Sequence, residues 1–110
     1  MNLKDMQREA HDNAVERGFW ENERNTGELL ALIHSEVSEA LEEYRNGRMK
    51  VASRPIGDIS KPEGFVTELA DIIIRVADLA EAYGYDLDVA VGEKMAYNRT
   101  RPYRHGGNLA

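Results

Sequence analysis

Apolar side chains recur along this chain every three to four residues, which is the spacing of amphipathic helices. In the second such segment, Leu30, Ile33, Val37, Leu41 and Tyr44 follow this spacing. Glycine or proline marks the end of each periodic segment. The pattern predicts an all-α fold of about four helices, at Leu3 to Arg17, Asn25 to Gly47, Ser60 to Tyr83, and Asp86 or Asp88 to about Asn98.

The third segment is apolar around nearly its whole circumference, which is typical of a central helix surrounded by others. Its β-branched run Ile72-Ile73-Ile74 also fits a strand, but the length of the surrounding pattern favours a helix. Ser60 with Glu63 three residues later forms a capping box, which predicts that the helix opens there. We expect the second and third helices to be the central antiparallel pair of a helical bundle.

A chain of 110 residues predicts a single domain over residues 1–110. A chain this short buries a modest core, so a homo-oligomer, either a dimer or a tetramer, is expected to complete the bundle. The N-terminus is polar and has no secretory signal, and no run of eighteen apolar residues exists. Cysteine is absent, which fits a reducing compartment. These features predict a cytoplasmic protein with no membrane partner.

The net charge of −6 is unevenly distributed along the chain. No acid follows Glu93, whereas one lysine and three arginines give this tail a charge of +4, which leaves −10 for residues 1–93. An acidic body argues against a nucleic-acid polymer as partner, because such proteins need a broad basic surface. The distribution fits a small polyanion held between metal and arginines, and a solvated basic tail is the alternative.

Two acidic pairs interrupt the apolar second and third segments. Glu36 and Glu39 form one pair, and Glu68 and Asp71 form the other. Residues three apart share a helix face, and a buried carboxylate is costly unless a cation or a donor compensates it. The two pairs therefore predict one metal site with four oxygen ligands. Oxygen ligation favours Mg²⁺ or Mn²⁺ over iron or zinc.

Other interpretations of these acids remain open. The pair that begins at Glu36 also fits an ordinary solvated face, because the same helix carries three further glutamates. Arg75 stands four residues after Asp71 and fits a surface ion pair with it. A di-iron centre is not expected, because it needs histidine three residues after a glutamate, and neither Glu36 nor Glu68 has one.

The C-terminal segment supplies candidate phosphate ligands. Lys94, Asn98 and Arg101 are spaced four and then three residues apart, so they share a face if the helix persists. Lysine offers a point charge, asparagine a donor, and arginine a bidentate clamp. Arg104 and His105 are further candidates, and an exposed tail histidine is the alternative for His105.

The order of these motifs resembles the MazG-like all-α nucleoside triphosphate pyrophosphatases. The acidic part is Glu36-x-x-Glu39, twenty-eight residues, then Glu68-x-x-Asp71; the C-terminal part is Lys94-x-x-x-Asn98-x-x-Arg101-Pro102-Tyr103-Arg104-His105-Gly106. The resemblance covers about residues 25–105. It implies a helical core assembled with a second subunit, Mg²⁺ dependence, and hydrolysis of a (deoxy)nucleoside triphosphate to monophosphate and pyrophosphate. It implies nothing about the base.

We therefore expect a Mg²⁺-dependent nucleotide pyrophosphohydrolase, with Glu36 or Glu39 as the base for a bound water. Trp20, the only tryptophan, either stacks on the nucleobase or anchors the core, and the anchor is favoured. Two alternative functions fit the same residues. One is a non-catalytic helical module for nucleotide sensing or protein interaction. The other is a MazG-like hydrolase of a phosphoribosyl nucleotide.

Overall fold

The structure is a computed structural model that describes residues 2–49 and 63–103. These residues form helices and no strand, which confirms the predicted all-α class. The helices are α1 (Leu3–Glu16), α2 (Thr26–Arg45), α3 (Phe65–Ala82) and α4 (Leu87–Thr100).

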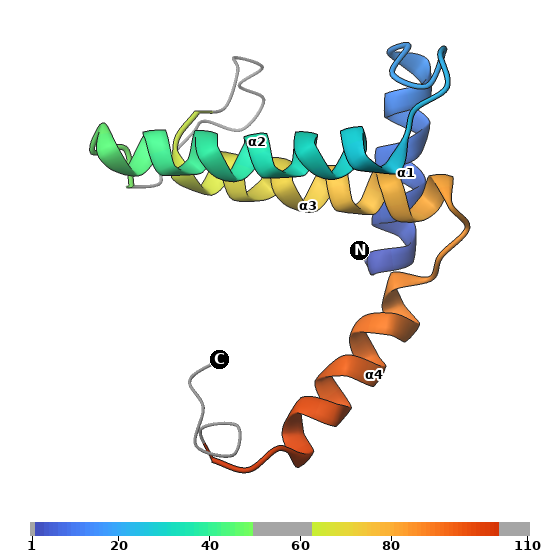
Figure 1. The fold of residues 1–110 in the computed structure, drawn as a ribbon, viewed down its shortest axis with the longest axis vertical. Helices are drawn as coiled ribbons and strands as arrows, with labels where there is room; N and C mark the ends of the chain where they lie inside the picture. The colour runs from blue at the N-terminus through green and yellow to red at the C-terminus, as the bar shows by residue number, and fades with distance from the viewer. Residues whose placement is uncertain (1, 50–62, 104–110) are drawn as a thin grey trace.

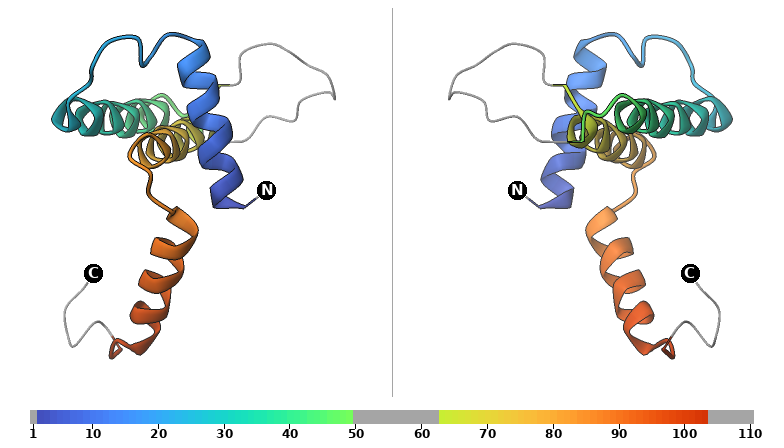
Figure 2. Two further views of the ribbon diagram at one scale, coloured as in Figure 1. Left: turned by 90° about the vertical axis from the view of Figure 1, so that its right-hand side faces the viewer. Right: turned by 90° about the vertical axis from the view of Figure 1, so that its left-hand side faces the viewer.

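The helices α2 and α3 lie side by side and antiparallel, and α1 crosses the pair (Figures 1 and 2). This arrangement confirms the antiparallel packing of α2 on α3, and α3 is the helix on which both α1 and α2 pack. The interior is small, since the buried apolar side chains of the described residues are Leu29, Ala40, Ala77 and Ala80. Three of these side chains are alanines, which let the helices approach closely but bury little apolar area.

Side-chain caps set the starts of α2 and α4 where the sequence predicts them. The N–H of Glu28 donates to Asn25 Oδ1 at 2.7 Å, and the N–H of Val89 donates to Asp86 Oδ1 at 3.2 Å. At the other end of α4, the backbone of Arg101 is extended because Pro102 follows it. Both helices therefore follow local rules that can be read from the sequence.

The predicted start of α3 is wrong. The helix begins at Phe65, preceded by Gly64, whose φ of +114° lies outside the helical region. Glycine tolerates this conformation without strain, so the helix starts only after Gly64, although Glu63 precedes it. The proposed capping residue Ser60 lies outside the described residues.

The start of α4 is joined to α1. Gln7 of α1 is fully buried; its Nε2 donates to Tyr85 O at 2.7 Å, and its Oε1 accepts from Leu87 N at 2.8 Å. The Asp88 carboxylate accepts from the first two N–H groups of α1, both at 3.2 Å. Beyond this joint α4 projects away from the other helices, and none of its residues is buried (Figure 1).

The described helices leave one face of α3 uncovered, although the sequence predicts a surrounded helix. Ile73 and Ile74 are 50 % and 46 % exposed. Together with Met6, Ala10 and Ala70 they line an apolar cavity of about 430 Å³ between α1 and α3. No helix in the described part of the chain has both the length and the apolar character to cross a membrane.

Candidate metal centre

Three of the four predicted carboxylates converge. One oxygen each of Glu36, Glu39 and Glu68 can be chosen so that all three lie within 4.8 Å of one another. Glu36 and Glu39 share a face of α2 because they are three residues apart, and antiparallel packing brings Glu68 of α3 opposite them. We call these three residues the acidic cluster.

Two oxygens of the acidic cluster are buried and lack hydrogen-bond partners in the described part of the chain. They are Glu36 Oε2 and Glu68 Oε2. Glu36 as a whole is only 7 % exposed. Because a buried polar atom without a partner is costly, each such atom calls for a proton, a cation or a donor. The cluster therefore has two features of a cation site: closely spaced carboxylate oxygens, and buried oxygens that require compensation.

Burial raises the pKa of Glu68 to about 7. The charge of Glu39 acts in the same direction, followed by that of Asp71, a hydrogen bond with Glu39, and the charge of Glu36. Two carboxylates share a hydrogen bond only when one of them holds a proton. Near neutral pH, a proton or a metal ion can thus relieve the same repulsion.

Asp71 does not join the acidic cluster, although the sequence places it in the site. It lines a neighbouring cavity of about 340 Å³ together with Glu36 and Arg75. Its charge is close enough to raise the pKa of Glu68. The structure therefore places one oxygen of each of three carboxylates within 4.8 Å of the others, and the fourth carboxylate in the wall of an adjoining cavity.

Arg75 is the feature that the sequence pattern missed. Its Nε donates to Glu36 Oε1 at 2.7 Å, across from α3 to α2, whereas its spacing suggested an ion pair with Asp71. A signal was present in the sequence, because Arg75 is the only cation in the whole of α3. A lone cation on an apolar helix must find an anion or water, and Glu36 is the nearly buried anion opposite it.

Trp20 belongs to a polar network around Asp78, which also lines the cavity beside Asp71. Its Nε1 donates to both oxygens of Asp78, at 2.9 and 3.2 Å. His11 Nδ1 lies 2.8 Å from Asp78 Oδ1, and the rings of His11 and Phe19 meet the indole edge-on. This arrangement fits a tryptophan that anchors α1 against α3. Asp78 and His11 were not predicted as part of any network.

The predicted phosphate ligands lie apart from the acidic cluster. Lys94 and Asn98 are exposed on α4, and Arg101 stands at its C-cap with an extended backbone, so the predicted shared face ends before it. Lys94 Nζ lies 5.0 Å from the centre of the Tyr97 ring. The helix α4 leaves the α2–α3 pair beyond the end of α3 and projects away (Figure 2). Arg104 and His105 lie outside the described residues.

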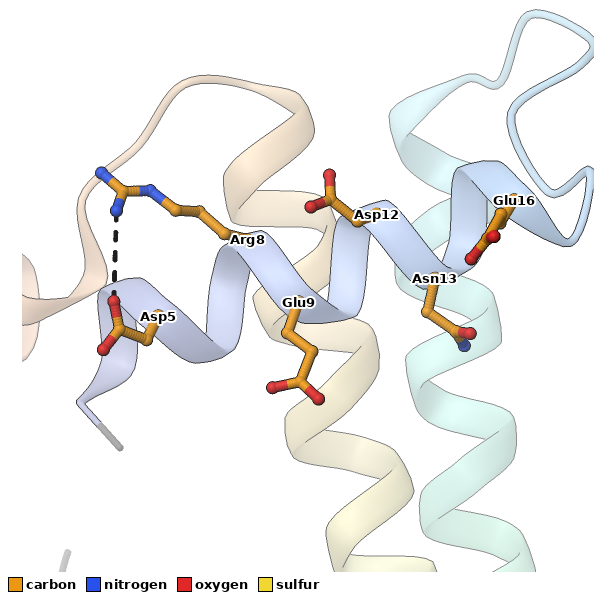
Figure 3. Close-up of a pocket in the computed structure, with 6 residues that line it drawn as sticks. All are labelled: Asp5, Arg8, Glu9, Asp12, Asn13 and Glu16. Atoms are coloured by element: carbon orange, nitrogen blue, oxygen red, sulfur yellow. Dashed lines mark ion pairs between the residues drawn. The ribbon is translucent and has the colours of Figure 1, made fainter.

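The outer face of α1 is acidic and holds a shallow hollow of about 510 Å³. In Figure 3 its residues project from α1, while α2 and α3 pass behind the helix. Arg8 lies 4.0 Å from Asp5. The rest of the lining is acidic or neutral, namely Glu9, Asp12, Asn13 and Glu16. Repulsion between these carboxylates and a polyphosphate makes this hollow unsuitable for a nucleotide.

No protein-family model, curated protein or solved structure matches the chain. The MazG-like resemblance therefore rests on the motif order alone.

Proposed function

We propose that this chain is a Mg²⁺-dependent nucleotide pyrophosphohydrolase that cleaves a (deoxy)nucleoside triphosphate to a monophosphate and pyrophosphate. The observation that carries the proposal is the acidic cluster, with two buried oxygens that lack hydrogen-bond partners among the described residues. Three hard oxygen donors suit Mg²⁺ or Mn²⁺, and the resemblance to MazG-like enzymes supplies the substrate class.

Glu36, Glu39 and Glu68 would hold the metal, and Asp71 would border it. The bound ion would supply Lewis acidity at the α-phosphoryl group and lower the pKa of a water. Of the two candidate bases, Glu36 is nearly buried, whereas Glu39 is exposed to water. We therefore assign the base role to Glu39. It takes a proton from the attacking water, whose oxygen bonds to the α-phosphorus as the bridging oxygen to the β-phosphorus leaves with pyrophosphate.

The cavity beside Asp71 is the proposed place for the rest of the nucleotide. Its volume of about 340 Å³ lies within the range of small-molecule sites. Its walls combine the ring of Phe19 with the polar side chains of Asn13 and Arg17. A mixed wall of this kind suits a sugar and base better than a phosphate chain alone.

A second copy of the chain would supply the phosphate ligands Lys94, Asn98 and Arg101, because α4 projects away from its own acidic cluster. The apolar cavity between α1 and α3 offers a place for the second copy's α4, on which Val91 and Met95 are exposed one turn apart. Charge favours this pairing, since the outer face of α1 is acidic and the end of α4 is basic.

A nucleotide panel with Mg²⁺, followed by separate assays for pyrophosphate and orthophosphate, tests the proposal. We expect pyrophosphate as the primary product, and a loss of at least about tenfold in rate for Glu68→Gln. Glu93→Gln, which removes an exposed acid on α4, should keep the activity. Orthophosphate as the primary product would contradict the proposed bond cleavage.

The same panel separates the alternatives. No turnover of any nucleotide with Mg²⁺ or Mn²⁺ would favour a non-catalytic module. Turnover of a phosphoribosyl nucleotide alone would favour the second alternative, a hydrolase with the same site and another substrate.

A further inference from the structure

Arg75 occupies a position between the acidic cluster and the cavity. Its Nε binds Glu36 Oε1 at 2.7 Å, and its side chain is about one third exposed. It lines the cavity of about 340 Å³ beside Asp71, and its guanidinium carbon lies 5.9 Å from the centre of the Phe19 ring. The guanidinium therefore faces a buried anion on one side and an open space on the other.

Among the described residues, Arg75 is the cation that neutralises Glu36. A metal ion bound to the acidic cluster could neutralise the same carboxylate in its place. Arg75 compensates Oε1 of this nearly buried carboxylate, and Oε2 has no hydrogen-bond partner in the described part of the chain. A divalent ion on the acidic cluster would repel the guanidinium and weaken its hold on Glu36. The two cations thus compete for one carboxylate.

The released guanidinium would lie beside the space in which we place the nucleotide. An arginine has five N–H donors in a planar fork that matches phosphate oxygens. In the described contacts of Arg75, Nε is the donor that Glu36 occupies. The remaining donors are on the end of the side chain.

We propose that Arg75 exchanges partners: it neutralises Glu36 in the metal-free protein, and it binds the substrate's phosphate chain once metal occupies the acidic cluster. This inference rests on the proposed function, since it assumes a metal site and a phosphorylated substrate. It assigns Arg75 two successive anions, where a purely structural ion pair would have one.

Two titrations on Arg75→Gln test the exchange. In the first, Mn²⁺ alone is titrated and binding is followed by electron paramagnetic resonance. Removal of the competing cation should tighten Mn²⁺ binding roughly fivefold or more. In the second, inorganic pyrophosphate is titrated with Mn²⁺ saturating. Loss of a charge-assisted contact should weaken pyrophosphate binding roughly tenfold or more.

Opposite signs in the two titrations are the signature of the exchange. A merely structural arginine would weaken both, or change neither, and either result would overturn the inference while the metal site stands. If Mn²⁺ does not bind the natural chain, both the proposed function and this inference fail. Arg45→Gln, which removes a surface arginine paired with Glu42 on α2, should change neither titration.

Arg75→Lys keeps the test decisive if the glutamine variant does not fold by circular dichroism. Lysine retains the positive charge but lacks the guanidinium fork. We expect its affinities for Mn²⁺ and pyrophosphate to lie between those of the natural chain and those expected for Arg75→Gln. Identical affinities in Arg75→Lys and the natural chain would overturn the assigned role of the fork.

Discussion

The ionisation of Glu68 depends on its burial and on the charges of the other acids around it. Burial and the neighbouring acids make its charged form unfavourable, which is why its pKa is raised to about 7. A proton or a divalent ion removes the same penalty. The ionisation of this one residue should therefore couple folding, pH and metal to one another.

The first residue-scale prediction concerns pH in the absence of metal. Folded Glu68 has a pKa of about 7 against an ordinary value of 4.5, so between these values the folded state binds more protons than the unfolded state. Its contribution to the free energy of unfolding must then fall as pH rises from 4.5 to 7. Denaturation in EDTA at several pH values should show Glu68→Gln gaining stability relative to the natural chain over this range.

Bound metal should reverse the order of stability of the natural chain and Glu68→Gln. Mg²⁺ or Mn²⁺ at pH 8 should raise the melting temperature of the natural chain, and much less that of Glu68→Gln. Glu93→Gln serves as a control, and its pH dependence in EDTA should follow that of the natural chain. Parallel pH curves for Glu68→Gln and the natural chain, or equal metal shifts, would count against the assigned site.

At this scale the sequence identified residue types better than partners. Spacing along one helix correctly predicted that Glu36 and Glu39 are neighbours, because residues three apart share a helix face. The same rule suggested Asp71 as the ion-pair partner of Arg75. In the structure, the packing of α2 on α3 places Arg75 against Glu36 instead. Side-chain partners across helices depend on rotation and depth, which no local spacing contains.

At the scale of elements, the joint between α1 and α4 decides where α4 points. Gln7 bridges the backbone on both sides of the turn after α3, through Tyr85 O and Leu87 N. The joint is buried at Gln7 and exposed at the ion pair of Lys4 with Asp86, which measures 3.4 Å. The direction in which α4 could extend toward a second copy is therefore set by this joint.

The prediction for this joint is a large loss of stability in Gln7→Leu. Leucine is of similar size but leaves the carbonyl of Tyr85 and the N–H of Leu87 without this partner. A fully buried unsatisfied group costs about 1–3 kcal/mol. Because these two groups are only part-buried, we take the lower part of that range for each and expect the free energy of unfolding to fall by roughly 2–4 kcal/mol. Urea denaturation measures it. Lys4→Ala, in the exposed part of the same joint, should cost less than about 1 kcal/mol. Equal losses for the two variants would contradict the clamp role of Gln7.

Element boundaries were predictable where one residue sets them. Asn25 and Asp86 cap α2 and α4 because a side-chain oxygen can satisfy free N–H groups at a helix start. The start of α3 was not predictable in this way, because the backbone of Gly64 overrides the local signal of Ser60 and Glu63. Gln7 gave no sequence signal, since its role depends on a turn about eighty residues away.

At the scale of the molecule, the described helices leave much apolar surface uncovered. Side chains exposed by more than a third occur on α2, α3 and α4, among them Val37, Leu69, Ile73, Val89 and Met95. Ile73 and Ile74 lie together in the apolar cavity between α1 and α3, and an exposed apolar patch of this kind marks an interaction site. The apolar periodicity predicted this surplus, but the placement of α4 did not follow from the sequence, because the joint with α1 about eighty residues away sets it.

The last prediction tests whether a second copy covers α3. Ile73 and Val15 are equally exposed, at 50 % each, but only Ile73 lines the apolar cavity between α1 and α3. If the chain were complete alone, a charge at either position would face water and cost little. We expect Ile73→Lys to break the oligomer or lower solubility, and Val15→Lys to do neither. Sedimentation at low micromolar concentration measures the assembly, and unfolding of the natural chain should depend on its concentration. A stable and fully active monomer would rule out the second copy, and with it the supply of Lys94, Asn98 and Arg101 from a partner.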